Sequence, residues 1–343
     1  MEATPVPSQA SAPHELAGRI ANEVLFPTAL ATDGADTVPP GHLDRLAAAG
    51  LYGAAGPGAA GGLGLDGAPF RAVVEALAGG CLATTFVWVQ HHRLVRALAR
   101  PDAPAALRDE WLRPLCGGER RAGVALGGLL PGPPRLAARR TADGWALDGE
   151  SPWVTGWGMV DVLLVAARGP GGAVVWLVMD AAADGRLTAE RRRLVAVDAS
   201  ATVRLAFDGV EVPAARLLRI DAPDAAEPVF AAALRTNGSL ALGVAGRCCR
   251  LMGPSALDDA LDACRRRLDE AEPAASADVR AEASDLALRA ASALVVHAGS
   301  RSVASDEHPQ RLAREAIFLL VFGSRPPIRA ALLKRLAGGR RGA

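Results

Sequence analysis

The residues best suited to chemistry lie in the segment SPWVTGWG, at residues 151–158. Trp153 and Thr155 are two positions apart, so a β-strand would place both side chains on one face. Gly156 and Gly158 then open a turn beyond them. An indole can cover the face of a planar heterocycle while a hydroxyl bonds its edge. This pattern suits a contact to a planar cofactor, but a core tryptophan beside a strand threonine is its more common origin.

A second candidate is the string GPGAAG at residues 56–61, which matches the G-x-G-x-x-G pattern of dinucleotide-binding loops. That pattern needs a preceding strand and a following helix within a βαβ unit. The preceding residues DRLAAAGLYGAA instead indicate the end of a helix. We therefore predict an ordinary loop here.

The histidines and cysteines do not form a recognisable reactive pattern. His91 and His92 end the apolar run FVWVQHH with no carboxylate close by in sequence, which indicates solvated or capping residues at a helix end more than an acid–base pair. The five cysteines are odd in number and contain no Cys-x-x-Cys spacing. Neither a disulfide framework nor a metal site is expected.

The triplet Arg265, Arg266 and Arg267 lies within a helical pattern. Such a run is typical of a solvated helix face, and the alternative is that one arginine pairs with a phosphate.

Length and composition bound the class of protein. The chain has 343 residues, of which 50% are hydrophobic, and this predicts a large core divided among two or three modules. With 38 basic and 37 acidic residues the net charge is +1, so bulk attraction to nucleic acid or to an anionic membrane is excluded. The first residues resemble no signal peptide, and no apolar run of membrane-spanning length follows. A soluble, cytoplasmic protein is expected.

Three kinds of hydrophobic pattern follow one another along the chain. Residues 15–116 have helical spacing, and residues 117–222 contain short valine-rich runs separated by Asp-Gly and Gly-Pro turns. Residues 223–338 return to helical spacing over four or five segments. The predicted fold is α+β: an N-terminal helical domain, a middle β domain of antiparallel type without helical crossovers, and a C-terminal four-helix-bundle-like domain.

Several motifs in this order resemble the acyl-CoA dehydrogenase family of flavoproteins. The glycine-rich loop with Pro57, Gly61, Gly62 and Gly64, the Trp153 segment, FDGVEVPAARLL at 207–218 and REA at 314–316 each look like a family motif. The resemblance runs from about residue 15 to residue 337 and implies the α, β, α architecture of that family.

The resemblance implies an FAD between the β domain and the C-terminal bundle. Trp153 would lie against the flavin ring, Thr155 would donate toward its N5, and the backbone near Leu126 would bond a flavin edge. Ser324 would bond the cofactor, and Arg267 would reach the FAD pyrophosphate of a neighbouring subunit. A homodimer or homotetramer is the implied state.

The family's catalytic carboxylate is missing from both positions where members carry it. Phe322 stands at the usual glutamate position, and Ala233 stands at the alternative position in the first long C-terminal helix. A general base contributes roughly 100- to 10,000-fold, so ordinary dehydrogenation of an acyl thioester should be slow. The catalytic residues therefore stay unknown.

Two further segments depart from the family pattern. LGGLLPGPP at 126–134 lacks the hydroxyl residues that contact flavin, and ASDEHPQR at 304–311 replaces a glycine-rich segment near the adenine. Three hypotheses remain: a flavin oxidoreductase acting on an acyl thioester or related small molecule, a catalytically incomplete subunit paired with a complete homologue, and a flavin-dependent monooxygenase.

Overall fold

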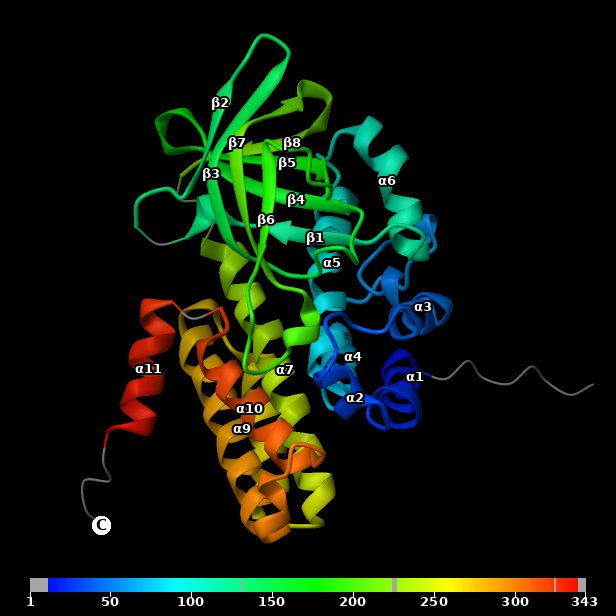
Figure 1. Cartoon of the computed structure of the whole chain (residues 1–343), viewed down its shortest axis with the longest axis vertical. Coiled ribbons are helices and arrows are strands. Elements are labelled where there is room, and N and C mark those ends of the chain that lie inside the picture. The colour runs from blue at the N-terminus through cyan, green and yellow to red at the C-terminus, as the bar shows by residue number, and fades with distance from the viewer. Residues whose placement is uncertain (1–11, 131, 224–226, 324, 339–343) are drawn as a thin grey trace, which may run out of the picture.

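A computed structural model describes residues 12–130, 132–223, 227–323 and 325–338 of the chain. Helices, strands and again helices follow one another, as the periodicity predicts. In Figure 1 the sheet lies above the two helical blocks, and α5 runs beneath it. Among the described helices, none combines the length and apolar character needed to span a bilayer.

The N-terminal block consists of short helices around one long apolar helix. Asp66 begins the fourth helix by accepting a hydrogen bond from the Gly67 amide over 2.7 Å. The helices are α1 (Pro13–Ile20), α2 (Ala29–Asp33), α3 (Pro40–Ala48), α4 (Gly67–Ala78), α5 (Leu82–Ala99) and α6 (Ala105–Gly117), with a π-helical segment at Ala21–Leu25.

The middle block is a strongly twisted sheet with the order β6-β7-β3-β2-β4-β5-β8, and β1 pairs with β4. Long antiparallel pairs dominate, such as β3 with β7, where Leu147 lies opposite Val210. The strands are β1 (Ala122–Ala125), β2 (Leu136–Arg140), β3 (Gly144–Val154), β4 (Val162–Arg168), β5 (Val174–Asp180), β6 (Leu187–Arg191), β7 (Val203–Pro213) and β8 (Leu217–Asp221).

One detail of the predicted sheet is corrected by the structure. β1 and β4 run parallel, with Gly123 opposite Leu163, and β2 also makes one parallel pairing with β4, so the sheet is mixed. Because the sequence of this region contains no helical crossover, it predicts antiparallel strands alone. The β2–β3 hairpin takes the place of a helical crossover. The chain turns again after β3, and β4 runs in the same direction as β1.

The C-terminal block contains five helices, of which α7 and α9 are the longest. Ser255 and Asp258 cap α8 reciprocally, which accounts for its sharp start after Pro254. The helices are α7 (Glu227–Met252), α8 (Ala256–Glu270), α9 (Ser276–Ala298), α10 (His308–Val321) and α11 (Pro326–Leu336).

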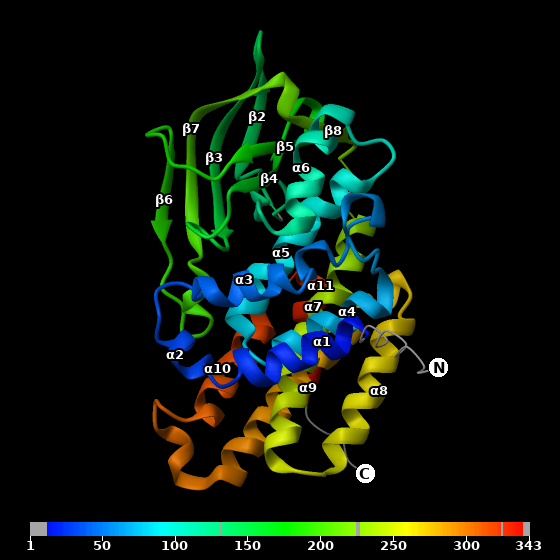
Figure 2. The same cartoon turned by 90° about the vertical axis from the view of Figure 1, so that its right-hand side faces the viewer.

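The largest core joins the two helical blocks. It includes Leu77 of α4, Trp88 of α5, Leu240 of α7 and Leu286 of α9, each at most 1% exposed. Gly79 and Gly243 allow α4 and α7 to approach closely, because a Cβ at Gly243 would collide with the carbonyl of Glu75. Figure 2 shows α4 beside α7, with α1 packed on α4. Separate clusters fill the two faces of the sheet, one of them against α5 and α6.

Candidate functional site

Trp153 and Thr155 lie in different surroundings at the end of β3. Trp153 is 61% exposed, whereas Thr155 is 4% exposed. The pairing of β3 with β7 is irregular between Ser151 and Val154, and the strand ends at Val154. Simple strand alternation therefore does not describe this pair, although the exposed indole face is available to a ligand.

The Thr155 hydroxyl belongs to a short buried chain of hydroxyls. It lies 3.3 Å from the Thr202 hydroxyl, which lies 2.9 Å from that of Ser200. The Gly156 amide donates to the Ser200 carbonyl over 2.8 Å. These contacts hold the end of β3 against the 3₁₀ turn at Asp198–Ser200 and limit the rotation of the Thr155 hydroxyl.

Phe322, at the position of the family glutamate, lies in an aromatic cluster. Its ring centroid is 4.7 Å from that of Phe86 in α5, nearly perpendicular, and 5.6 Å from that of Phe318 in α10. These contacts are favourable edge-to-face and stacked geometries. The position is packed as an apolar contact between α5 and the end of α10, and the described residues next to it include no carboxylate in place of the missing one.

The chain after Phe322 contacts two other elements of interest. A Cβ at Gly323 would lie 3.0 Å from the Asn237 side-chain nitrogen, so this turn lies directly against α7. Arg325 donates to the carbonyl of Leu129 over 3.1 Å, which ties the same turn to the segment after β1. Ser324, predicted to bond the cofactor, lies outside the described residues.

Leu126 follows β1 directly and is partly buried against the cluster between the sheet and α5. Its carbonyl accepts a hydrogen bond from the Leu129 amide over 3.0 Å. Residues 126–129 thus form a tight turn at the end of β1. The Arg325 contact places this turn near the turn that follows α10.

A cavity of about 540 Å³ lies between α4, α5, α7 and the strands β4 and β5. This volume is in the usual range for sites that bind small molecules. Val89 and Gln90 of α5 line it from one side, and Ala233 and Asn237 of α7 line it from the other. Because Asn237 also faces Gly323, one wall of the cavity adjoins the turn that follows Phe322.

The acid–base groups around the cavity are sparse. Ala233 lines the wall but carries no titratable group, and Asp66 is the one carboxylate among the described lining residues. Asp66 is exposed and caps α4, so it is not shielded from water. The described lining of the cavity therefore includes no shielded carboxylate suited to α-proton abstraction.

Arg267 is engaged within its own chain. It forms an ion pair with Glu282 of α9, and Arg335 of α11 approaches the same carboxylate over 3.6 Å. Arg265 likewise pairs with Glu75 of α4 over 2.5 Å. Arg265 and Arg267 of the triplet thus have partners within the chain, and a phosphate would have to compete with Glu282 for Arg267.

His91 and His92 do not lie at a helix end, contrary to the expectation from the apolar run. α5 continues to Ala99, and both rings are at most 1% exposed. Burial lowers the pKa of His91 to about 3 and the pKa of His92 well below its usual value, so both are neutral core residues. The string at residues 56–61 contains the 3₁₀ turn Gly58–Ala60 and lies in the loop between α3 and α4.

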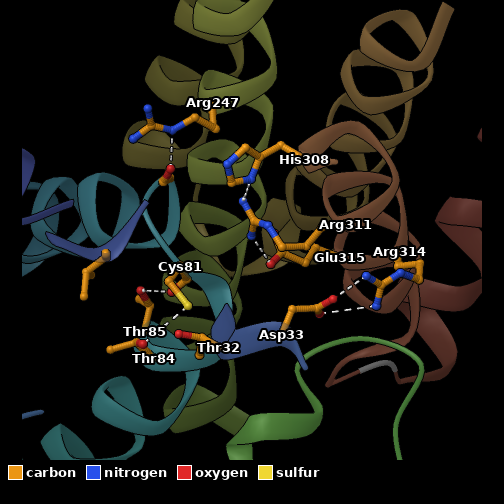
Figure 3. Close-up of polar contacts among 12 residues, drawn as sticks. Thr32, Asp33, Cys81, Thr84, Thr85, Arg247, His308, Arg311, Arg314 and Glu315 are labelled. Atoms are coloured by element: carbon orange, nitrogen blue, oxygen red, sulfur yellow. Dashed lines mark hydrogen bonds and ion pairs between the residues drawn. The ribbon is translucent and has the colours of Figure 1, made fainter. Parts of the chain in front are cut away.

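The REA segment of α10 belongs to a buried charged cluster near the N-terminal helices. Arg311 pairs with Glu315, and Arg314 pairs with Asp33 of α2 over 2.5 Å (Figure 3). Burial raises the pKa of Glu315, with Arg311 opposing the shift. Figure 3 also shows His308 beside Arg311, and Arg247 of α7 bonded to a backbone carbonyl. The segment fastens α10 to the rest of the molecule.

The arginines that line the cavity are the residues missed by sequence reasoning. Arg93 and Arg96 lie three residues apart on α5, and Arg100 follows directly after the end of this helix. The three-residue spacing places Arg93 and Arg96 on one side of the helix, and this pair could have been noticed. Arg219 of β8 and Arg235 of α7 join them only through the fold.

Comparison with known proteins finds similar sequences for part of the chain. Residues 9–119 match the family model described as acyl-CoA dehydrogenase, N-terminal domain. The human mitochondrial short-chain specific acyl-CoA dehydrogenase is 25% identical over 139 residues, which make up 39% of this chain and 34% of that protein. The matched part thus spans about a third of the length of this curated relative.

Solved structures share the whole architecture. Butyryl-CoA dehydrogenase from Megasphaera elsdenii aligns with a TM-score of 0.77 at 18% identity, covering 96% of this chain and 98% of that one. A structure described as PigA with FAD and proline aligns with a TM-score of 0.81 at 16% identity, covering 97% and 99%. At these identities the likeness to the solved structures shows the fold, and the match of residues 9–119 relates the N-terminal part of the chain to the acyl-CoA dehydrogenase family.

Proposed function

We propose that this protein is a flavin-dependent oxidoreductase of the acyl-CoA dehydrogenase type, with FAD as its cofactor, acting on an acyl thioester or a related small molecule. One observation carries the proposal: neighbouring residues of α5 contact three parts of the candidate site. Phe86 packs on Phe322, Val87 lies against Gly156 beside Thr155, and Val89 lines the cavity. The flavin-facing strand end, the family's base position and the cavity thus share one helix.

The residues present fit the ring end of the cofactor. Trp153 has an exposed indole that can cover a flavin ring, and the Thr155 hydroxyl is oriented by Thr202 and Ser200. A bound flavin supplies a hydride acceptor. The turn at Leu126 offers backbone groups near the same end, whereas Arg267 would have to leave Glu282 to reach a pyrophosphate.

The chain's own residues limit the proton chemistry. Neither Phe322 nor Ala233 can accept a proton, and Asp66 is exposed. Without a positioned base, substrates that need α-proton abstraction should react roughly 100- to 10,000-fold more slowly than with one. We therefore expect a substrate with an acidic C–H, or an oxidation that needs no α-proton base.

A second candidate is a catalytically incomplete subunit. It is favoured by Phe322, which is held by two aromatic rings and so serves packing in place of catalysis. We expect the chain to associate with further copies as a homodimer or homotetramer, and exposed Ile317, Val321 and Leu333 on α10 and α11 support such an association.

The test begins with the visible absorption spectrum of the purified protein after incubation with FAD and gel filtration. Retained flavin is expected, and Trp153→Ala should lose it, while Ile220→Ala on β8 serves as a control that also removes an exposed apolar side chain. A wild-type protein that retains no flavin would rule out the stand-alone enzyme.

The reaction is then tested by anaerobic mixing of the flavin-loaded protein with a panel of acyl-CoAs and with oxygen after chemical reduction. Phe322→Glu should accelerate flavin bleaching by a saturated acyl-CoA, because it supplies the missing carboxylate. Flavin retention without bleaching by any substrate, in the wild type and in Phe322→Glu, would favour the incomplete-subunit hypothesis.

A further inference from the structure

The cavity is unusually cationic for a site lined by only one carboxylate. Six arginines come from four different elements and face it, together with Asp66. In sequence order they are Arg71, Arg93, Arg96, Arg100, Arg219 and Arg235. The protein as a whole has a net charge of +1, so the cavity concentrates positive charge that the rest of the surface balances.

Half of these arginines are neutralised by carboxylates of their own. Arg71 pairs with Asp269 over 2.6 Å, Arg100 with Asp102 over 2.8 Å, and Arg219 with Asp221 over 3.0 Å. In addition, Arg219 lies 4.6 Å above the ring of Trp176. These three arginines have structural roles that explain their presence.

The other three arginines form no ion pair with a carboxylate of the described residues. Arg96 lies over the ring of Phe70 at 4.0 Å, which satisfies part of its charge. Arg93 and Arg235 have no such aromatic contact among the described residues. The Nη1 of Arg93 and the Nε of Arg235 are buried and have no hydrogen-bond acceptor in the described structure. Both residues come from helices that face each other across the cavity, α5 and α7.

A buried guanidinium N–H without an acceptor is costly, and proteins seldom keep one without a use. Burial, with Arg96 and Arg325 nearby, lowers the pKa of Arg93 to about 10, which leaves it charged at neutral pH. Asp66, the carboxylate in the lining, acts on Arg96. The positive charge around Arg93 thus calls for an anion that the described residues do not provide.

We propose that the cavity binds an oxyanion group of the ligand, a carboxylate or a phosphate, between Arg93 and Arg235. The planar guanidinium fork suits both oxyanions, and charge-assisted hydrogen bonds of this kind are the strongest available to side chains. Phe70, Leu164 and Trp176 line the same cavity and would pack on the apolar part of the ligand. The proposal rests on the proposed function, because it names the chemical class of substrate that the cavity of that oxidoreductase would bind.

The test is calorimetric titration of the full-length protein, with and without FAD, at constant ionic strength. The probes are inorganic phosphate, glutarate as a dicarboxylate, and acetate as a small monocarboxylate. We expect saturable binding of phosphate or glutarate. Phosphate alone would identify a carrier phosphate as the natural group, and preference for glutarate over acetate would identify a carboxylate on the substrate.

Two variants and one control locate the site. Arg93→Gln and Arg235→Gln should each weaken binding by at least ~10-fold, the loss expected for a charged hydrogen bond. Arg45→Gln, which removes an equal charge from an exposed position on α3, should change it by less than ~2-fold. Without ligand, Arg93→Gln should melt at the same or a higher temperature, because it removes an uncompensated buried charge.

Two results would overturn the proposal: no binding of either oxyanion by the wild type, or equal affinity in the wild type and both variants. The wild-type titration decides the matter even where a variant does not fold. Retention of flavin, measured by the absorption of the same samples, distinguishes a failure of the anion site from a failure of the proposed function. Flavin without anion binding leaves the proposed function intact, and anion binding without flavin leaves this site intact.

Discussion

Arg311 and Glu315 form an ion pair one helical turn apart on α10, with side-chain exposures of 1% and 4%. The second carboxylate oxygen of Glu315 has no described hydrogen-bond partner. Two charges so fully removed from water depend on each other, since each would otherwise be a buried, uncompensated charge. The pair also lies beside the Arg314–Asp33 contact that joins α10 to the N-terminal helices.

Replacing Glu315 by glutamine should therefore leave Arg311 buried without a counter-charge. We expect Glu315→Gln to lower the free energy of unfolding by about 3–5 kcal/mol, measured by urea denaturation. The matched control is Asp285→Asn, which breaks an i,i+4 pair with Arg289, whose side chain is 54% exposed. That change should cost less than about 1 kcal/mol, and similar losses for both variants would contradict the argument.

The glycine-rich loop before α4 offers a second test. A Cβ at Gly62 would collide with the backbone of Gly56, whereas a Cβ at Gly58 would meet open space. The Gly64 amide also donates to the Gly56 carbonyl over 2.8 Å, so this hydrogen bond holds the two sides of the loop together. Gly62→Ala should destabilise the protein by at least about 2 kcal/mol, and Gly58→Ala should stay within about 0.5 kcal/mol, by thermal or urea unfolding. Equal tolerance of the two would mean that the loop is not packed as described.

The buried histidines predict that the free energy of unfolding falls with pH already at pH values well above those at which carboxylates titrate. In the folded protein the pKa of His91 is about 3 and that of His92 is also lowered, from an ordinary value of 6.5. Below pH 6.5 the unfolded chain therefore binds more protons than the folded one, and the free energy of unfolding falls as the pH falls. The slope is up to about 1.4 kcal/mol per pH unit for each histidine.

Urea denaturation between pH 5 and pH 7 measures this slope. His92→Leu should reduce it by up to about 1.4 kcal/mol per pH unit, because one titrating group is removed. A slope unaffected by His92→Leu would show that this ring takes up protons as readily in the folded protein as in the unfolded chain.

The succession of helical and β blocks was predictable because each block carries its own period. Valine-rich runs such as 162–168 and apolar helices such as 82–99 differ in pattern over many residues, and tertiary contacts reinforce that pattern. The parallel pairing of β1 with β4 was not predictable, because partner choice depends on the route of the β2–β3 hairpin and leaves no local mark.

The candidate site was predictable only where one segment carries it. Trp153 and Thr155 stand out as a pair in sequence, but their different exposures arise from the irregular end of β3. The cavity arginines come from positions as distant as Arg71 and Arg235, and which of them have carboxylate partners depends on packing between elements. The pairing of Arg267 with Glu282 likewise follows from α8 packing on α9.

Arg280 of α9 provides the last prediction, because it holds the end of α10 just before the turn at Gly323. Its side chain is 1% exposed and donates to the carbonyls of Leu319 over 2.9 Å and Phe322 over 3.3 Å. A cation at this place satisfies the unpaired carbonyls of a helix C-terminus.

Arg280→Met keeps most of the apolar volume but removes the guanidinium from both carbonyls, which leaves Leu319 with the Ser284 hydroxyl as its side-chain donor. We expect a loss of about 2–3 kcal/mol in the free energy of unfolding, together with a change in the near-ultraviolet circular dichroism of the aromatic cluster around Phe322. Arg289→Met, on the exposed side of the same helix, should cost less than about 1 kcal/mol and leave the aromatic signal as it is. An unchanged aromatic signal in Arg280→Met would show that Phe86 and Phe318 alone hold Phe322 in place, without Arg280.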